Sequence, residues 1–173
     1  MSQVLGEHTR VAFASPHGLD QIRATFGDIF QYVLPDHTLD PRWQADSLTR
    51  IALPFAMALS WDKPRTMTQM TCPKLMAGSF TDVFERLHGD GLQDKITTFG
   101  GCFSFRPQRT GTKLSAHFWG IAIDLNPETN AQGTAGHVDR NVVQIFRAAG
   151  FERRGDWQGR GRDPMHFQYC TGY

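Results

Sequence analysis

The chain has 173 residues, of which 40% are hydrophobic and 20% are charged, and its formal net charge is +1. These values are typical of one globular domain and exclude a disordered or membrane-embedded chain. The near-zero charge also argues against a nucleic-acid-binding protein, which would carry a strongly basic surface.

The first half of the chain predicts one short helix and two strands. Residues 1–17 are predicted as a tail with an edge strand over 11–14. Apolar residues at helical spacing over 18–27 predict a helix that ends at Gly27. Residues 31–48 contain two prolines and are predicted as a loop. The apolar run 50–59 predicts a strand with a bulge or edge position at Pro54, and weak alternation over 61–70 predicts a second strand.

The second half predicts two amphipathic helices and three strands. Residues 79–88 carry apolar side chains at i, i+3, i+4 and i+7, and a helix over 138–149 has Asp139 as its N-cap. Strands are predicted over 97–105, 120–124 and 165–170, with loops over 107–114 and 126–137. Helices and strands occur without regular βαβ alternation. The sequence therefore predicts an α+β fold, a single domain over 1–173 with a small, mostly antiparallel sheet and flanking helices.

The stretch 115–124 combines metal-ligating residue types with a strand pattern. His117 precedes the strand, and Asp124 shares one strand face with the small residues Gly120 and Ala122. Because the side chains beside Asp124 on this face are small, there is room for a metal ion next to the backbone. Taken alone, the stretch fits equally well a core strand with a solvated Asp at its end.

The last predicted strand supplies a further candidate ligand for a metal site at 115–124, with a carboxylate close before it. His166 lies on its polar face, and Asp163 precedes it by three residues. His117, Asp124 and His166 give Zn²⁺ three protein ligands and leave a fourth position open, as in catalytic zinc sites. Asp163 is then free to act as a base. Cys170 is a rival ligand, but four strand residues place it roughly 13 Å from His166.

Two motifs carry a family resemblance across the second half of the chain. They read Ser-Ala-His-Phe-Trp-Gly-Ile-Ala-Ile-Asp-Leu-Asn-Pro at 115–127 and Gly-Asp-Trp…Asp-Pro-Met-His-Phe-Gln over 155–168, with Phe-Arg-Pro upstream at 105–107. The chain thereby resembles the zinc D-Ala-D-Ala carboxypeptidase and L-alanyl-D-glutamate endopeptidase family, which includes bacterial wall-trimming enzymes and phage endolysins. The resemblance implies a hedgehog/D-Ala-D-Ala-peptidase-like fold, with the catalytic motifs in 100–170.

The resemblance also implies roles for individual residues. Arg106 stands where the family has an Arg that polarises the scissile carbonyl and stabilises the oxyanion, with Arg109 as a rival close in sequence. Asp163 takes the proton of the attacking water and passes it to the leaving amine. Pro164 biases Asp163 toward an extended conformation. Three further candidates for substrate contact or support of the ligands are Ser115, Trp119 and Gln168, with Trp119 favoured as a packing residue that frames the cleft.

One departure from the family pattern precedes the second motif. Close relatives usually have an aromatic residue and a Gly before Gly-Asp-Trp, where this chain has Arg153 and Arg154. The three predicted metal ligands are all present, so we expect the departure to affect substrate preference. These arginines belong to a basic cluster with Arg160 and Arg162, which fits a solvated loop better than a surface for an anionic wall polymer.

The N-terminus and the cysteines bear on where the protein works. Residues 1–10 show no signal peptide, and the run 51–59 is too short to span a bilayer. Cys72, Cys102 and Cys170 form no CxxC pair and are predicted as reduced, mostly buried thiols. We therefore expect synthesis in the cytoplasm and action on the cell wall after release, in a phage or prophage context.

The sequence thus predicts a monomeric zinc metallopeptidase that cuts a peptide bond in the peptidoglycan stem. Its partners would be the stem peptide and Zn²⁺, without nucleic acid or membrane insertion. An L-alanyl-D-glutamate endopeptidase and a D-alanyl-D-alanine carboxypeptidase both fit. Two alternatives remain open: a non-catalytic, zinc-stabilised wall-peptide-binding domain of a phage particle, and a zinc hydrolase that acts on another small amide.

Overall fold

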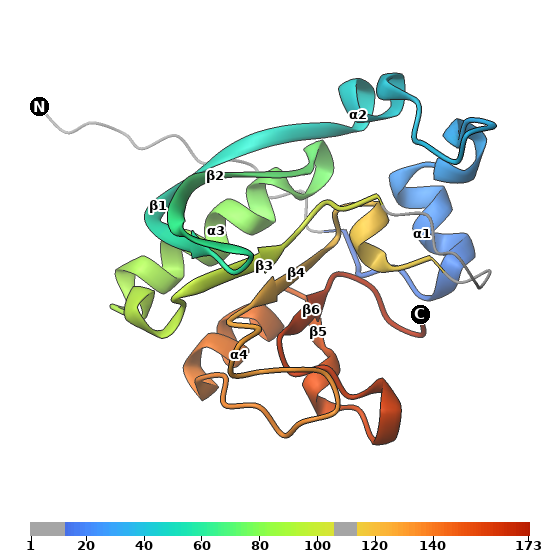
Figure 1. Ribbon diagram of the computed structural model, residues 1–173. Helices are drawn as coiled ribbons and strands as arrows, with labels where there is room; N and C mark the ends of the chain where they lie inside the picture. The colour runs from blue at the N-terminus through green and yellow to red at the C-terminus, as the bar shows by residue number, and fades with distance from the viewer. Residues whose placement is uncertain (1–12, 106–113) are drawn as a thin grey trace, which may run out of the picture.

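A computed structural model describes residues 13–105 and 114–173, except for the side chain of Arg160 (Figure 1). In this part of the chain one six-stranded sheet has the order β2-β1-β3-β4-β6-β5. The paired strands are antiparallel except β1 and β3, which are parallel. The α+β prediction with a mostly antiparallel sheet is therefore confirmed. The strands are β1 (Leu48–Leu59), β2 (Asp62–Pro73), β3 (Thr98–Gly101), β4 (Ala122–Leu125), β5 (Glu152–Arg153) and β6 (His166–Gln168).

The longest strands are the two that the sequence predicted in the first half of the chain, and they pair as the β1–β2 hairpin. Their pairing runs from Leu48 opposite Pro73 to Leu59 opposite Asp62 and shifts register between Ala52 and Met57. Pro54 lies within this interruption, because a proline cannot donate a ladder hydrogen bond. The predicted bulge at Pro54 is confirmed.

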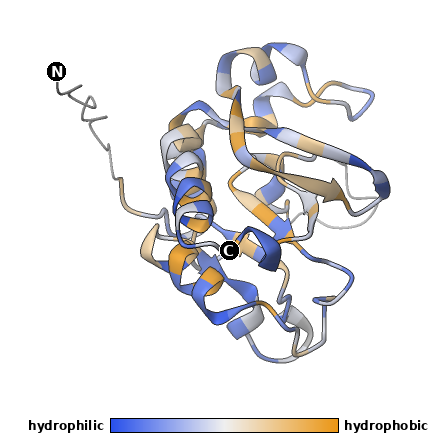
Figure 2. Ribbon diagram, turned by 90° about the vertical axis from the view of Figure 1, so that its left-hand side faces the viewer, coloured by the Kyte–Doolittle hydropathy of each residue, from blue (hydrophilic) through white to orange (hydrophobic). Residues whose placement is uncertain are grey.

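The predicted helices are present as α1 (Gly18–Phe26), α3 (Ala77–Gly89) and α4 (Arg140–Ala148). The Asp139 side chain accepts a hydrogen bond from the Asn141 N–H, as expected of an N-cap. α3 and α4 contact each other on one side of the sheet (Figures 1 and 2). Hydrophobic and hydrophilic positions are mixed along the helices (Figure 2), and the buried ones lie at helical spacing, as Phe80, Val83, Phe84 and Leu87 do in α3.

Three sequence predictions of secondary structure need correction. The loop predicted over 31–48 contains the helix α2 (Pro41–Ser47), capped by Asp40, whose carboxylate accepts from the Arg42 N–H. The strand predicted over 97–105 ends at Gly101, where a φ of +132° takes the chain out of the sheet. Residues 13 and 14 are not in a strand, and residues 11 and 12 lie outside the described ranges.

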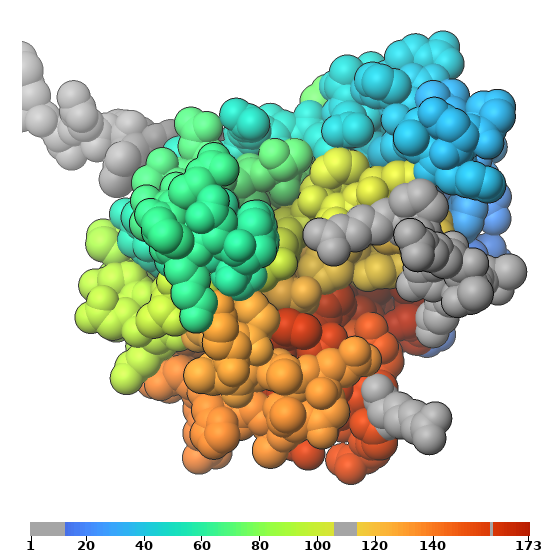
Figure 3. Space-filling view, viewed as in Figure 1, coloured from blue at the N-terminus to red at the C-terminus, as the bar shows by residue number. Residues whose placement is uncertain are grey.

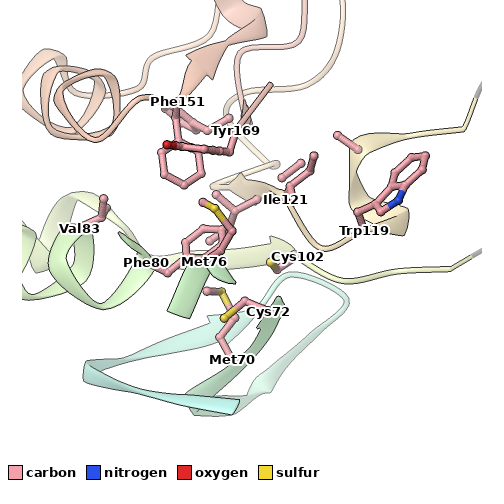
Figure 4. Close-up of a cluster of buried hydrophobic side chains, with 14 of the residues drawn as sticks. Met70, Cys72, Met76, Phe80, Val83, Cys102, Trp119, Ile121, Phe151 and Tyr169 are labelled. Carbon is pink, nitrogen blue, oxygen red and sulfur yellow. The ribbon is translucent and has the colours of Figure 1, made fainter. Parts of the chain in front are cut away.

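A single hydrophobic core joins the two halves of the chain. Met70 and Cys72 of β2, Phe80 of α3, Ile121 before β4 and Tyr169 after β6 belong to one buried cluster (Figure 4). Cys72, Cys102 and Cys170 are all buried, as predicted. Among the described residues, none of the helices has the length and apolar character that crossing a membrane requires. The core thus fixes the hairpin relative to the strands that carry the predicted ligands.

Candidate metal centre

The three predicted ligands meet at one point beside the sheet. Asp124 on β4 lies directly opposite His166 on β6, so both side chains leave the same face of the sheet. His117 comes from the short 3₁₀ helix Ala116–Phe118, which precedes β4. Its Nε2 lies 3.2 Å from His166 Nδ1 and 3.2 Å from Asp124 Oδ2, while His166 Nδ1 lies 2.9 Å from Asp124 Oδ1. One ligand atom from each residue lies within 4.8 Å of the others, which suits a metal ion.

Backbone and side-chain acceptors set the tautomers of the two histidines. His117 Nδ1 lies 2.7 Å from the Cys102 carbonyl oxygen, which can only accept, so this nitrogen carries the proton. Gln168 donates its Nε2 hydrogens to the carbonyls of Cys170 and Tyr173. Its Oε1 is therefore turned to His166 Nε2, 3.0 Å away, which must donate. In the neutral histidines, His117 Nε2 and His166 Nδ1 are left unprotonated and are the candidate ligand atoms.

The donor set fits a cation. Two imidazole lone pairs and a carboxylate converge within hydrogen-bond distance, and such a group is stable only with a proton or a metal ion at its centre. His₂Asp ligation with an open position is a zinc-type arrangement. The residues present therefore fit the Zn²⁺ that the sequence predicted.

Without a metal, the charges of this group shift its protonation equilibria. Burial would raise the pKa of Asp124, but hydrogen bonds from His117 and His166 and their charges hold it well below its usual range. Burial would lower the pKa of His117, but the hydrogen bond and negative charge of Asp124 outweigh it, so this pKa is raised. A proton on His117 thus takes the place that a cation would occupy.

Asp163 is a buried carboxylate next to this group. It is 9% exposed, and its Oδ1 has no hydrogen-bond partner in the described parts of the chain. Its backbone N–H donates to the Arg154 carbonyl, and its own carbonyl accepts from the His166 N–H, which fixes the position of Asp163 relative to His166. Burial raises the pKa of Asp163, and the negative charge of Asp124 raises it further. A buried carboxylate with one oxygen left without a hydrogen bond can accept a proton from a bound reactant.

A cavity of about 630 Å³ opens beside His117 and Asp124. One side is formed by the end of β3 and the residues that follow it, and the other by the β1–β2 hairpin. In the space-filling view, the hairpin (green) borders a hollow whose other sides are the yellow and orange segments that carry β3 and β4 (Figure 3). The candidate site is thus open to a substrate from the side of the hairpin.

The remaining predicted residues occupy different environments. Ser115 lines the cavity and accepts from the His117 N–H at the start of the 3₁₀ helix. Trp119 is fully buried, and its Nε1 donates to the Gly27 carbonyl, which ties this segment to the end of α1. Gln168 supports His166, as described above. Arg106 and Arg109 lie outside the described residues.

The arginines around the second motif contact their own loop. Arg153 Nε donates to the Pro164 carbonyl and Arg162 Nε to the Gly155 carbonyl, while the Arg154 guanidinium lies over the Trp157 ring at 4.4 Å. These contacts stabilise the conformation of the segment between β5 and β6, which includes Asp163. The described arginine side chains of the cluster therefore help to position the candidate base.

Sequence reasoning missed two residues that shape the site. Gly100 faces Asp124, and a Cβ there would lie 2.8 Å from the Asp124 Cβ, so only glycine allows the observed approach of β3 to β4. Cys102 contributes its carbonyl oxygen to His117. The pair Gly100-Gly101 was a signal for the first, since adjacent glycines in a strand often mark a close approach of another backbone. No sequence signal identifies a backbone carbonyl as a histidine partner.

Residues 108–169 match the family model described as D-alanyl-D-alanine carboxypeptidase. This match covers just over a third of the chain and includes His117, Asp124, Asp163 and His166, but begins after Arg106. It supports the family resemblance and a peptidase that acts on peptidoglycan-type peptides. Searches of curated proteins and of solved structures gave no significant match.

Proposed function

We propose that the protein is a zinc metallopeptidase that hydrolyses a peptide bond in the peptidoglycan stem. The observation that carries this proposal is the convergence of His117 Nε2, His166 Nδ1 and the Asp124 carboxylate beside the buried, unpaired Oδ1 of Asp163. The first three residues would hold Zn²⁺. When bound, zinc would supply Lewis-acid activation of water and of the scissile carbonyl.

The chain's own residues would supply the proton transfers and the orientation. Asp163 would accept the proton of the attacking water at Oδ1 and deliver it to the leaving amine. Cys102 and Gln168 would keep the two imidazoles in the tautomers that leave their facing nitrogens free. We also assign to Arg106, from the family resemblance, the stabilisation of the developing oxyanion.

The same site serves either of two cleavages. An L-alanyl-D-glutamate endopeptidase and a D-alanyl-D-alanine carboxypeptidase would use identical metal and base residues and differ in the shape of the cleft. We further propose that the protein acts on the cell wall after release from the cell in which it is made, as a phage lysis enzyme does. The cleavage products identify the bond.

The experiment is hydrolysis of purified peptidoglycan by zinc-loaded protein, with released termini identified by mass spectrometry. New D-Glu amino termini would indicate an endopeptidase, and free D-Ala a carboxypeptidase. EDTA should abolish the reaction. Bound zinc without cleavage of any wall preparation would instead support a wall-peptide-binding domain.

Replacing the proposed base gives the sharper test. Asp163→Asn keeps the shape of the side chain but cannot accept the proton, so we expect activity to fall roughly 10²–10⁴-fold while zinc is retained. Asp94→Asn removes an exposed carboxylate on the Gln93–Lys95 3₁₀ helix and should behave as wild type. An Asp163→Asn protein with wild-type turnover would refute the role of Asp163.

A further inference from the structure

The cavity has one wall that the proposed chemistry does not use. His117, Asp124 and Ser115 line the cavity on the side of β3 and β4. Leu59, Trp61, Met67 and Gln69 of the hairpin line the opposite side. The hairpin residues are largely apolar and contribute no metal ligand or base. The role of these hairpin residues therefore lies outside the reaction itself.

Trp61, in the turn between β1 and β2, is the most exposed large hydrophobic residue in the described part of the chain. Its exposed fraction is 63%, and its ring lies 6.1 Å from that of Phe99 at an interplanar angle of 57°. Phe99 is itself buried in β3, so the indole is supported on one side and open on the other. Single exposed hydrophobic residues are common, but this one lines the same cavity as two metal ligands.

Contacts with the sheet hold the turn in place over the cavity. Ala58 and Leu59 pair with Thr98 and Phe99 of β3, and the Ser60 N–H donates to the Phe99 carbonyl. Lys63 Nζ lies 3.8 Å from Glu128 Oε1. The Glu128 carboxylate also accepts a hydrogen bond of 2.6 Å from the Thr98 hydroxyl. The backbone of the turn that carries Trp61 is therefore held in place before a ligand binds, which lowers the entropic cost of contact with that ligand.

The floor of the cavity leaves room for a polypeptide backbone. β1 pairs with β3 only as far as Phe99 and then turns into β2, so Gly101 lies beyond the last paired residue on that side. A Cβ at Gly101 would have no atom within 4 Å. An extended peptide can lie along such a strand end, with its side groups directed alternately toward the hairpin and away from it.

We propose that the β1–β2 hairpin is the specificity wall of the substrate cleft, and that Trp61 contacts a part of the wall peptide remote from the cleaved bond. This inference rests on the proposed function and adds the residue that distinguishes long from short substrates. Trp61 would contribute equally to binding of the ground state and the transition state, because it lies outside the ligand and base set. Removal of such a contact raises KM and leaves kcat unchanged.

The test compares two substrates with zinc-loaded wild type and Trp61→Ala. For the full stem peptide, we expect a roughly 5- to 50-fold higher KM in the variant, the size expected for loss of an aromatic anchor, with kcat within about twofold of wild type. For a dipeptide that contains only the scissile bond, wild type and variant should have the same kcat/KM. Trp61→Phe should restore most of the binding of the full stem.

A matched control separates a substrate contact from a general surface effect. Leu75→Ala also removes an exposed hydrophobic side chain, 56% exposed, that does not line the cavity, and it should leave both substrates unaffected. Equal losses on both substrates in Trp61→Ala would indicate a structural role and overturn the inference, as would an unchanged KM for the full stem. If wild type cleaves neither substrate, the proposed function fails and this inference falls with it. Cleavage by wild type with an unaffected Trp61→Ala protein overturns this inference alone.

Discussion

At the scale of single residues, the orientation of two imidazole rings defines the site. His117 and His166 present different nitrogens to the centre, Nε2 and Nδ1, because their other nitrogens donate to Cys102 and Gln168. The sequence singled out both histidines, Asp124 and Asp163 as candidates, since each falls in a motif with recognisable spacing. It could not tell which nitrogen of each imidazole faces the other two candidate ligands, because that depends on acceptors that folding brings from elsewhere in the chain.

Substitution of Gln168 tests whether its hydrogen bond with His166 Nε2 matters for metal binding. Gln168→Met removes the acceptor for the His166 Nε2–H and should weaken zinc binding roughly 10- to 100-fold, measured by competition with a chelator. Gln168→Glu keeps an acceptor for His166 but loses the donors to the Cys170 and Tyr173 carbonyls. It should keep its zinc affinity and lose stability by about 1–3 kcal/mol.

Gln144→Met is the matched control for the Gln168 variants. It replaces an exposed glutamine on α4 and should change neither zinc affinity nor stability. A folded Gln168→Met protein with the wild-type zinc affinity would show that the hydrogen bond does not support the ligand.

At the scale of elements, local patterns predicted the amphipathic helices and the two long strands but failed at short, capped or glycine-rich segments. α2 was missed although Asp40-Pro41 is a typical N-cap followed by a first-turn proline. The strand β3 was predicted too long, because the alternation continues through Phe105 while Gly101 takes the chain out of the sheet. β5 has only two residues, too few for any periodicity.

The contact between β3 and β4 leads to a prediction for Gly100. A Cβ at this position would lie 2.8 Å from the Asp124 Cβ and 3.2 Å from its carbonyl oxygen, and neither atom can move without its strand. Gly100→Ala should therefore displace Asp124, weaken zinc binding and destabilise the protein by roughly 1–3 kcal/mol. Chelator competition and thermal unfolding measure the two effects.

Gly78→Ala is the control for Gly100→Ala. Gly78 lies in α3, where a Cβ would meet no atom within 4 Å, so alanine should stabilise the helix by about 0.5–1 kcal/mol without effect on zinc. Wild-type zinc affinity in Gly100→Ala would show that β4 tolerates a wider spacing from β3 at the site.

At the scale of the whole molecule, the sheet order places the first half of the chain beside the site. β1 pairs with β3 in parallel, and α3 lies between the hairpin and β3 in the chain, so the hairpin comes to face His117 and Asp124 across the cavity. The motifs in the sequence predict the chemistry in residues 100–170 and none in the hairpin. Strand order depends on long-range packing against one shared core, and no local pattern in the hairpin predicts its neighbour.

The pH dependence of the stability of the whole protein should reflect the protonation of His117 and Asp124. In the metal-free protein the pKa of His117 is raised, so its stabilising contribution is complete below about pH 6.5, the ordinary histidine value, and is lost as the pH rises through the higher folded-state pKa. The pKa of Asp124 is lowered, so its contribution is present above about pH 3.9 and is lost as the pH falls further. The metal-free protein should therefore have a higher Tm near pH 5.5 than near pH 8.

Zinc should reverse this trend, because metal and protons compete for the same nitrogens. The gain in Tm on adding zinc should be larger at pH 8 than at pH 5.5, and zinc at about 1,000 times its Kd should stabilise the fold by about 4 kcal/mol. Thermal unfolding at both pH values, with EDTA or with zinc, measures the effect. Asp124→Asn isolates the site from the other histidines: it should flatten the pH dependence of the metal-free protein and remove most of the zinc effect. An unchanged pH dependence in Asp124→Asn would mean that the His117–Asp124 pair does not control the stability of the fold.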